Sequence, residues 1–268
     1  MDDHGLPYSA NLSLLFTELP LLDRPAAAAG AGFTAVEFWW PFTEAVPPAA
    51  KVDRFIHAIK VSGVALTGLN LYAGDMEAGD RGLVSWVGRE AEFAESLAVA
   101  VRIAKRLGCR SLNALYGNRI ENVDPAEQDK LALANLDLAA EEAWRADAQI
   151  LIEPLSGADH YPLRTAAHVT EIIDEIGRDN IRLLADLYHL AVNRDDLGAA
   201  VTDPRVGHLQ IADAPGRHQP GTGSLDLGGY LGKAEAAGYR GYVGIEYKPL
   251  GGTVASLGWL PFERRGRE

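Results

Sequence analysis

The sequence predicts an α/β fold, a single (βα)8 barrel over residues 1–268, from three observations. Eight short apolar runs alternate with segments of helical periodicity, and such continuous runs are typical of a parallel sheet covered by helices. The chain of 268 residues has room for eight strand-plus-helix units, which together need about 250 residues. An open doubly wound sheet would normally have a glycine-rich phosphate turn after an early strand, and neither GxGxxG nor GxxxxGK[ST] is present.

The amino-terminal half contains four predicted strands and the helices between them. Val52, Phe55, Ile56 and Ile59 recur at the spacing of one helix face, and Gly63 follows as the left-handed residue that ends such a helix. The predicted strands are Ser9–Phe16, Ala35–Trp40, Val64–Tyr72 and Ser111–Tyr116. The predicted helices are Ala26–Ala31, Pro47–Ser62, Arg89–Leu107 and Ala126–Asp147, and a long loop is expected at Ala73–Gly88.

In the carboxy-terminal half, four apolar runs each stop on a polar residue. The polar residues are Glu153, Asp186, Gln210 and Glu246, and their separations of 33, 24 and 36 positions are each near the length of one strand-plus-helix unit. The four predicted strands are Gln149–Pro154, Arg182–Asp186, Val206–Gln210 and Tyr242–Glu246. The helical segments between them are predicted at Thr165–Ile176, Asp195–Val201 and Leu225–Ala237.

Composition excludes several classes of partner. A net charge of −12 and a pI near 5.0 disfavour nucleic acid and acidic membrane surfaces, since both are bound through clustered Lys and Arg. Cys109 is the only cysteine, so no intramolecular disulfide is possible. Asp2 and Asp3 stand where a signal peptide would be basic, and no apolar run approaches the roughly 18 residues of a membrane span. We therefore expect a cytoplasmic protein.

The four strand-end residues predict a metal site. In a closed barrel the carboxyl ends of the strands surround one mouth, so Glu153, Asp186 and Glu246 would lie close together there. Three carboxylates without a cation raise one another's pKa, and a divalent cation removes that conflict. With the carbonyl of Gln210 the ligands are all oxygen, which favours Mg²⁺ or Mn²⁺ over Zn²⁺. The alternative is that these residues are ordinary solvated or ion-paired strand ends.

Four further residues are candidates for substrate binding. His189 follows Asp186 by three positions and would lie in the same mouth, and Arg217 follows the seventh strand, where it could contact an anion. Arg81 in the long third loop and Lys248 just past Glu246 are candidates for the same role. The glycine-rich segment 220–223 follows the seventh strand, where many barrels bind phosphate, but it contains no Lys, and a turn is the favoured interpretation over a phosphate loop. No Gly-x-Ser-x-Gly motif supports nucleophilic hydrolysis.

Motifs along nearly the whole chain then identify a family. The chain resembles the hydroxypyruvate isomerase family within the xylose-isomerase-like TIM barrel superfamily, and the combination of His-Leu-Gln-Ile-Ala-Asp, Pro-Gly-Thr-Gly and Glu-Tyr-Lys-Pro is its most specific part. The matching segments are Ser9–Ser13, Gly79–Gly82, Gly88–Glu90, Leu151–Pro154, Asp186–His189, Gly207–Asp213, Pro220–Gly223 and Glu246–Pro249.

The resemblance implies a role for each strand-end residue. Residues matching Glu153, Asp186, Gln210 and Glu246 bind a divalent ion, and Glu153 and Glu246 also act as acid and base. In related ketose epimerases the third ligand is His; Gln210 therefore favours the hydroxypyruvate isomerase branch and argues against a zinc nuclease relative. The implied reaction interconverts hydroxypyruvate and tartronate semialdehyde (2-hydroxy-3-oxopropanoate) through a cis-enediolate, with a hydride shift as the alternative route.

Other interpretations stay open at this point. The enzyme could isomerise a four-carbon 2-oxo acid or epimerise a ketose at C3, or the chain could be a non-catalytic metal-binding barrel. A small 2-oxo acid or sugar acid is the expected partner, in glyoxylate metabolism for the hydroxypyruvate isomerase branch. A homodimer or homotetramer is common in the superfamily, while the residues themselves do not indicate an oligomeric state.

Overall fold

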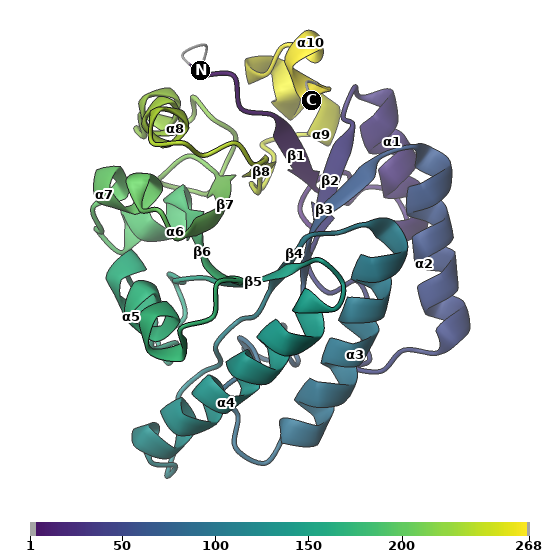
Figure 1. The fold of residues 1–268 in the computed structure, drawn as a ribbon. Helices are drawn as coiled ribbons and strands as arrows, with labels where there is room; N and C mark the ends of the chain where they lie inside the picture. Colours follow the sequence, from purple (N-terminus) through teal and green to yellow (C-terminus); the bar gives the residue numbers. More distant parts are fainter. Residues whose placement is uncertain (1–3, 267–268) are drawn as a thin grey trace.

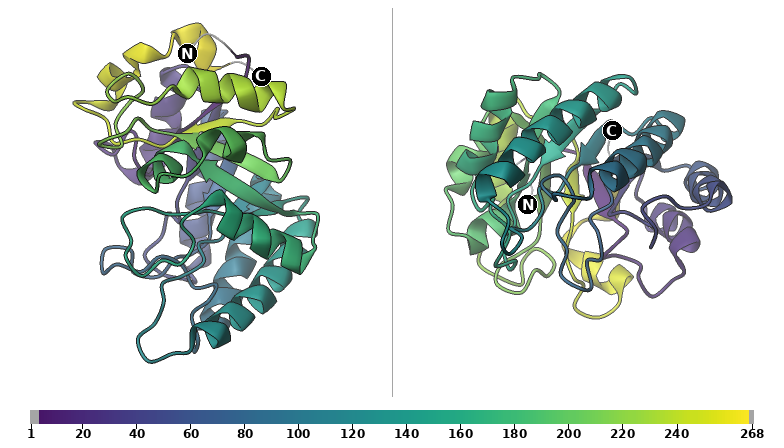
Figure 2. Two further views of the ribbon diagram at one scale, coloured as in Figure 1. Left: turned by 90° about the vertical axis from the view of Figure 1, so that its left-hand side faces the viewer. Right: turned by 90° about the horizontal axis from the view of Figure 1, so that it is seen from below.

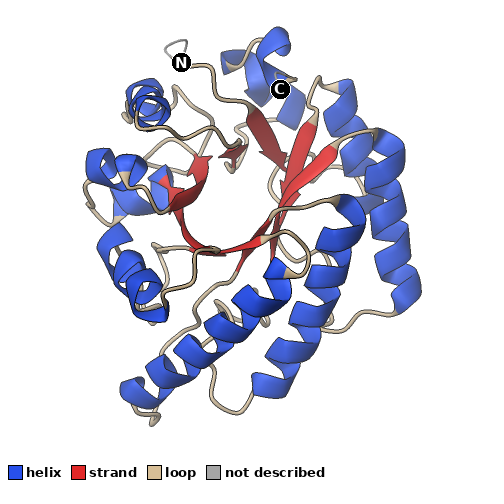
Figure 3. Ribbon diagram, in the orientation of Figure 1, coloured by secondary structure: helices blue, strands red, loops and turns tan. Residues whose placement is uncertain are grey.

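The computed structural model describes residues 4–266, and these form a closed barrel of eight parallel strands in the order β1 to β8 (Figure 1). Every neighbouring pair is parallel, and β8 closes the barrel by pairing with β1 through Tyr8 and Val243. The strands form an inner ring that the helices surround (Figure 3). The predicted (βα)8 barrel is therefore confirmed. The outermost residues of the predicted domain, 1–3 and 267–268, lie outside the described part.

All eight strands lie where apolar runs predicted them, with small differences in their ends. The clearest correction concerns the first, which was expected to continue to Phe16 and stops at Asn11. There the Asn11 carbonyl accepts the backbone N–H of Leu15, which turns the chain out of the sheet. The strands are β1 Tyr8–Asn11, β2 Ala35–Phe38, β3 Ala65–Asn70, β4 Ser111–Asn113, β5 Gln149–Ile152, β6 Ile181–Asp186, β7 Val206–Ile211 and β8 Val243–Ile245.

The helices cover the outside of the barrel with their apolar faces. In α2 the residues Val52, Phe55, Ile56 and Ile59 are buried as predicted, and Gly63 ends the helix in the left-handed conformation with φ 77°. The main helices are α1 Arg24–Gly30, α2 Ala49–Ser62, α3 Glu90–Leu107, α4 Pro125–Trp144, α5 Ala166–Ile176, α6 Leu187–Val192, α7 Leu197–Thr202 and α8 Leu227–Ala236. A short helical segment, η1 Leu21–Asp23, precedes α1. Three more follow β8: α9 Thr253–Ser256, η2 Leu257–Trp259 and α10 Phe262–Arg265.

Two features of the helical layer were not predicted accurately. α4 ends at Trp144 rather than Asp147, and α6 begins directly after Asp186, whose carboxylate caps it by accepting the N–H of Tyr188 at 2.8 Å. α3 and α4 are the longest helices of the described chain and lie next to each other (Figure 2). Between residues 4 and 266 the structure contains no helix both long and apolar enough to cross a bilayer.

The barrel places the four predicted strand-end residues at its carboxyl-terminal mouth. Glu153 immediately follows β5, Asp186 ends β6, Gln210 is the penultimate residue of β7, and Glu246 immediately follows β8. Asp186 and Gln210 are directly paired across β6 and β7. All four residues are at least 96% buried.

Candidate active site

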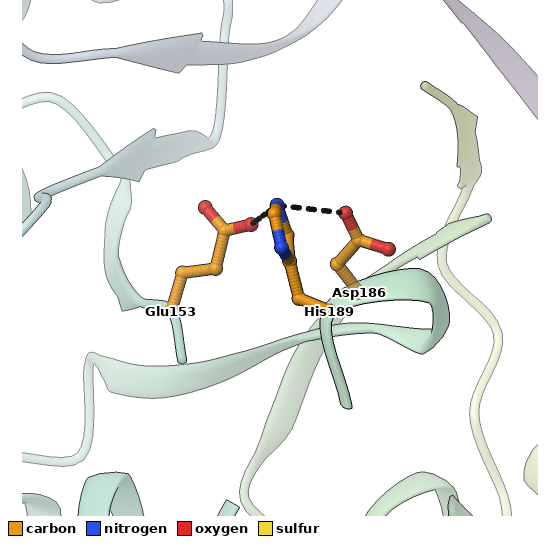
Figure 4. A group of neighbouring side chains, drawn as sticks. All are labelled: Glu153, Asp186 and His189. Atoms are coloured by element: carbon orange, nitrogen blue, oxygen red, sulfur yellow. Dashed lines mark ion pairs between the residues drawn. The ribbon is translucent and has the colours of Figure 1, made fainter. Parts of the chain in front are cut away.

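Two carboxylates and one imidazole form the centre of the site (Figure 4). His189 Nε2 lies 3.9 Å from Glu153 Oε1 and 3.6 Å from Asp186 Oδ2. One ligand atom from each residue lies within 4.8 Å of those of the other two. The three residues come from the ends of β5 and β6 and from α6, so the parallel barrel brings together positions that are separate in the sequence.

Buried amides orient the two glutamates. Asn113 Nδ2, at the end of β4, donates a hydrogen bond of 2.8 Å to Glu153 Oε2. Asn11 Nδ2, at the end of β1, donates a bond of the same length to Glu246 Oε2. Each glutamate therefore has one oxygen fixed by an amide. These two asparagines are not among the predicted site residues, because both lie inside predicted apolar runs that continue to Phe16 and Tyr116.

Arg217 lies against the acidic cluster. Its guanidinium donates to Glu246 Oε1 and approaches Asp186 Oδ2 at 3.4 Å. The residue has a left-handed backbone with φ 59°, which is uncommon for a side chain of this size. Arg217 was predicted to contact the substrate; the structure shows that it also supplies positive charge to two of the predicted metal ligands.

Burial dominates the ionisation of both glutamates. Burial, and after it the nearby Asp186 charge, raises the pKa of Glu153 to about 8. Burial also raises the pKa of Glu246 well above its ordinary value, and the Arg217 charge only partly offsets this. A nearby cation would stabilise the ionised form of both buried glutamates and lower their pKa values again.

Gln210 contributes an unsatisfied oxygen to the barrel interior. Its Nε2 donates to Glu37 Oε1 at 2.7 Å, while its buried Oε1 has no hydrogen-bond partner among the described residues. Buried polar atoms are normally paired, so an unpaired carbonyl oxygen is a position that a ligand fits. Three carboxylates, one free amide oxygen and no thiolate make a donor set that fits a hard divalent cation.

His189 is arranged to donate a hydrogen bond. Its Nδ1 accepts the backbone N–H of Ser156 at 3.0 Å and lies 2.7 Å from Ser156 Oγ. The proton of the neutral ring is therefore on Nε2, which faces Glu153 and Asp186. Burial lowers the pKa of His189 to about 4, so the ring is neutral at physiological pH. A protonated Nε2 cannot bind a metal, which favours the predicted contact with substrate.

A cavity of about 490 Å³ opens above these residues. Glu153, Glu246, His189 and Arg217 line it together with the predicted Arg81 and Lys248. Arg81 is half-buried, and its guanidinium is held by the backbone carbonyls of Met76 and Asp80. Lys248 is exposed. Further lining residues are Trp39, Asn70, Met76, Glu77, Leu115, Leu155, Ser156, Gly157, Tyr188, Val192 and Gly216.

The glycine-rich segment 220–223 does not present its amides to a phosphate. The N–H groups of Gly221 and Gly223 both donate to Asp213 Oδ2 at 2.8 Å, and Leu225 N–H donates to Asp213 Oδ1 at 3.1 Å. The phosphate-loop interpretation is therefore wrong. Asp213 instead organises the loop after β7, and its carbonyl accepts the backbone N–H of Arg217 at 3.1 Å.

The fold and site together define a class: a (βα)8 barrel with a buried acidic cluster at its carboxyl-terminal mouth. Residues 25–261 match the family model described as xylose isomerase-like TIM barrel. The chain belongs to this family.

Named relatives give the comparison more detail. A Streptomyces coelicolor protein named "Putative hydroxypyruvate isomerase" is 50% identical over 265 residues, which cover 95% of each chain. The Escherichia coli protein named hydroxypyruvate isomerase is 35% identical, with 95% of this chain and 98% of that protein covered. A Cupriavidus necator protein named 2-oxo-tetronate isomerase is also 35% identical, with 94% of this chain and 96% of that protein covered.

Proposed function

We propose that this chain is a metal-dependent isomerase that interconverts hydroxypyruvate and tartronate semialdehyde. That the chain is an isomerase agrees with the names of its relatives over nearly its whole length. The observation that carries the finer proposal is the pair of buried glutamates, Glu153 and Glu246, fixed by amides on either side of an acidic cluster. Both line the same cavity, so both can face one bound substrate.

The cation would be held by Glu153, Asp186, Glu246 and the free carbonyl oxygen of Gln210. Mg²⁺ and Mn²⁺ suit this all-oxygen set. When bound, the ion supplies Lewis-acid stabilisation to negative charge on the substrate carbonyl and hydroxyl oxygens. Arg217 would then share Glu246 and Asp186 with the ion, which keeps the site from accumulating uncompensated negative charge.

The glutamates would carry out the proton transfers. One removes a proton from C3 of hydroxypyruvate, giving the cis-enediolate, and the other, or the same one, returns a proton to C2. The O3 hydroxyl loses its proton while O2 gains one, so the product is the aldehyde with a hydroxyl at C2. Asn113 and Asn11 each fix one glutamate oxygen, and Arg217 donates to the second oxygen of Glu246, so Glu153 Oε1 is the oxygen that would face the reacting carbons most freely.

The remaining predicted residues would bind the substrate. His189 Nε2–H would donate to a substrate oxygen, and Arg217, Lys248 or Arg81 would bind the substrate carboxylate, since all three line the cavity. A homodimer or homotetramer, a cytoplasmic location and a place in glyoxylate metabolism remain predictions, and light scattering would measure the number of copies.

A four-carbon 2-oxo acid is the second candidate substrate. The relative named 2-oxo-tetronate isomerase is as similar to this chain as the Escherichia coli hydroxypyruvate isomerase. A cavity of about 490 Å³ is also larger than a three-carbon acid requires. Both substrates share the 2-oxo acid end, so the same glutamates would act on either. A ketose 3-epimerase and a non-catalytic metal-binding barrel are the remaining alternatives.

A substrate panel with and without a chelator tests the proposal. Purified protein with Mg²⁺ or Mn²⁺ is expected to turn over hydroxypyruvate, and in D2O the product should carry solvent deuterium at C2. Intact transfer of substrate deuterium from C3 to C2 would instead indicate a hydride shift. Faster turnover of 2-oxo-tetronate would assign the four-carbon substrate, and faster epimerisation of a ketose would assign that reaction. Absence of turnover on all of them would favour a binding protein.

A further inference from the structure

Glu37 is a buried carboxylate inside the barrel that the proposed chemistry does not use. It is the third residue of β2 and is 2% exposed. Two glycines leave space for it. A Cβ at Gly244 would lie 2.5 Å from Glu37 Oε1 and 2.8 Å from Gln210 Cγ, and one at Gly68 would lie 3.3 Å from Glu37 Cβ. The barrel interior is thus shaped around this side chain.

Three side chains bond the Glu37 carboxylate. Gln210 Nε2 donates to Oε1 at 2.7 Å, and Asn11 Nδ2 donates to the same oxygen at 3.0 Å. His208 Nε2 lies 2.7 Å from Oε2. Asn11 uses the same nitrogen to bond Glu246, so Glu37 is connected to two of the four proposed metal ligands.

The hydrogen bonds to the Glu37 carboxylate determine which end of the Gln210 amide faces it. A carboxylate only accepts hydrogen bonds, so the NH2 end of Gln210 must face Glu37. The carbonyl end then cannot face Glu37, and its buried Oε1 has no hydrogen-bond partner among the described residues. The carbonyl and NH2 ends of an amide have nearly the same shape, so packing alone distinguishes poorly between the two orientations of the Gln210 side chain. An NH2 group has no available lone pair and cannot bind a metal ion.

We propose that Glu37 is a positioning residue that holds Gln210 with its carbonyl oxygen, and not its NH2 group, toward the metal site. This inference rests on the proposed function, because it assigns Gln210 as a ligand. The competing explanation is a purely structural role, in which Glu37 serves only as the buried partner of His208. If Glu37 positions Gln210, the loss of Mn²⁺ affinity caused by a change at Glu37 is reversed when residue 210 presents an oxygen at both ends. If the role of Glu37 is purely structural, a change at residue 210 does not restore the affinity.

The Glu37→Gln substitution separates the two explanations. The introduced NH2 group can face either Gln210 or His208, so residue 37 no longer holds Gln210 in a single orientation and its NH2 group can turn to the metal. We expect the affinity for Mn²⁺, measured by calorimetry on the purified metal-free protein, to fall about 10- to 100-fold. The double variant Glu37→Gln/Gln210→Glu keeps the total charge and restores an oxygen toward the metal. Its affinity should return to within a few-fold of the unmodified protein.

Gln149→Leu is the matched control. Gln149 is a barrel amide at the opposite end of β5, where it donates to Ser111 Oγ and the Gly207 carbonyl, both at 3.0 Å. This variant should lose stability without losing Mn²⁺ affinity. If Glu37→Gln does not fold, Gly68→Ala is the second test, because its Cβ would lie 3.3 Å from Glu37 Cβ and 3.5 Å from Glu37 Oε2, would meet no atom of Gln210 within 4 Å, and changes no charge. Gly68→Ala should also weaken Mn²⁺ binding.

The outcomes separate this inference from the proposed function. If the unmodified protein binds no Mn²⁺, both are wrong. If it binds Mn²⁺ and Glu37→Gln binds equally well, only the positioning role is wrong. If Glu37→Gln weakens binding and the double variant fails to restore it although it is folded by circular dichroism, Glu37 has a structural role and the inference is overturned.

Discussion

The backbone N–H of Ser156 donates a hydrogen bond of 3.0 Å to Nδ1 of His189. This bond comes from the loop after β5, and it fixes the proton of a neutral imidazole on the nitrogen that faces the acidic cluster. A main-chain donor cannot be removed by mutation of its side chain. The tautomer of His189 is therefore determined by the path of the backbone, and the first prediction follows from this.

His189→Leu is expected to lower kcat/KM for the substrate roughly 10- to 100-fold. A hydrogen bond to a charged group contributes about 1.5–3 kcal/mol, and about 1.4 kcal/mol corresponds to a factor of ten. Ser156→Ala retains the backbone N–H and should change kcat/KM by only a few-fold. Steady-state kinetics of both variants checks this, and equal losses would show that the hydroxyl, not the main chain, orients the ring.

Glu153→Gln and Glu246→Gln should each lower kcat by about 10²- to 10⁴-fold at saturating Mn²⁺, the usual contribution of general acid–base catalysis. Glu77→Gln is the control, because Glu77 lines the same cavity outside the cluster. Its kcat should stay near that of the unmodified protein. Deuterium incorporation at C2 should fall together with turnover. Full activity of either cluster variant would exclude that glutamate from proton transfer.

Removal of the metal should abolish turnover and lower the midpoint of thermal unfolding. A ligand at 100 times its Kd stabilises the native state by about 2.7 kcal/mol, which corresponds to several degrees for a chain of this size. Dialysis against a chelator, followed by addition of Mg²⁺ or Mn²⁺, checks both effects. Unchanged turnover and unfolding in the chelator-treated protein would contradict a metal site.

The affinity for Mn²⁺ should increase with pH and level off above about pH 8. Burial and the Asp186 charge raise the pKa of Glu153 from 4.5 to about 8, so below that pH the metal must displace a proton. One displaced proton gives about a tenfold change in affinity per pH unit. Calorimetry across pH 6–9 measures this slope, and Glu153→Gln should reduce it.

The raised pKa of Glu153 also makes the stability of the metal-free protein depend on pH. Metal affinity rises with pH, whereas this contribution to stability falls. The folded state binds the proton of Glu153 more tightly than the unfolded state does. The contribution of this residue to stability is therefore complete below about pH 4.5 and is lost as the pH rises through about 8. Urea unfolding of the metal-free protein at several pH values should show this loss, and Glu153→Gln should remove its part of the pH dependence.

Asp213→Asn should raise the KM for the substrate and destabilise the protein by about 1–3 kcal/mol. The substitution replaces an acceptor oxygen by an NH2 group that faces the amides of Gly221 and Gly223, which leaves these partly buried hydrogen bonds unmade. Because the same loop carries Arg217, substrate binding should weaken as well. Thr222→Ala, in the same turn, should leave KM unchanged. Urea unfolding and steady-state kinetics give the two measurements.

Local patterns in the sequence were sufficient for the fold and for the position of the acidic cluster. An apolar run that stops on Glu153 or Asp186 marks a strand and its carboxyl end, since hydrophobic periodicity reflects local burial. Parallel strands in one barrel then bring those ends to one mouth. The same reasoning missed Asn11 and Asn113, which orient the glutamates, because the apolar runs that contain them continue past the true ends of β1 and β4.

The tertiary structure alone decided which partners these residues have. Glu37 lies 173 positions from Gln210, and Arg217 meets Glu246 through a loop whose path depends on Asp213. The backbone N–H groups of Gly221 and Gly223, in the segment considered as a phosphate loop, donate to that same aspartate. The physical reason is that a side chain's partners are set by packing between distant strands and loops, whereas local periodicity records only whether a position is buried.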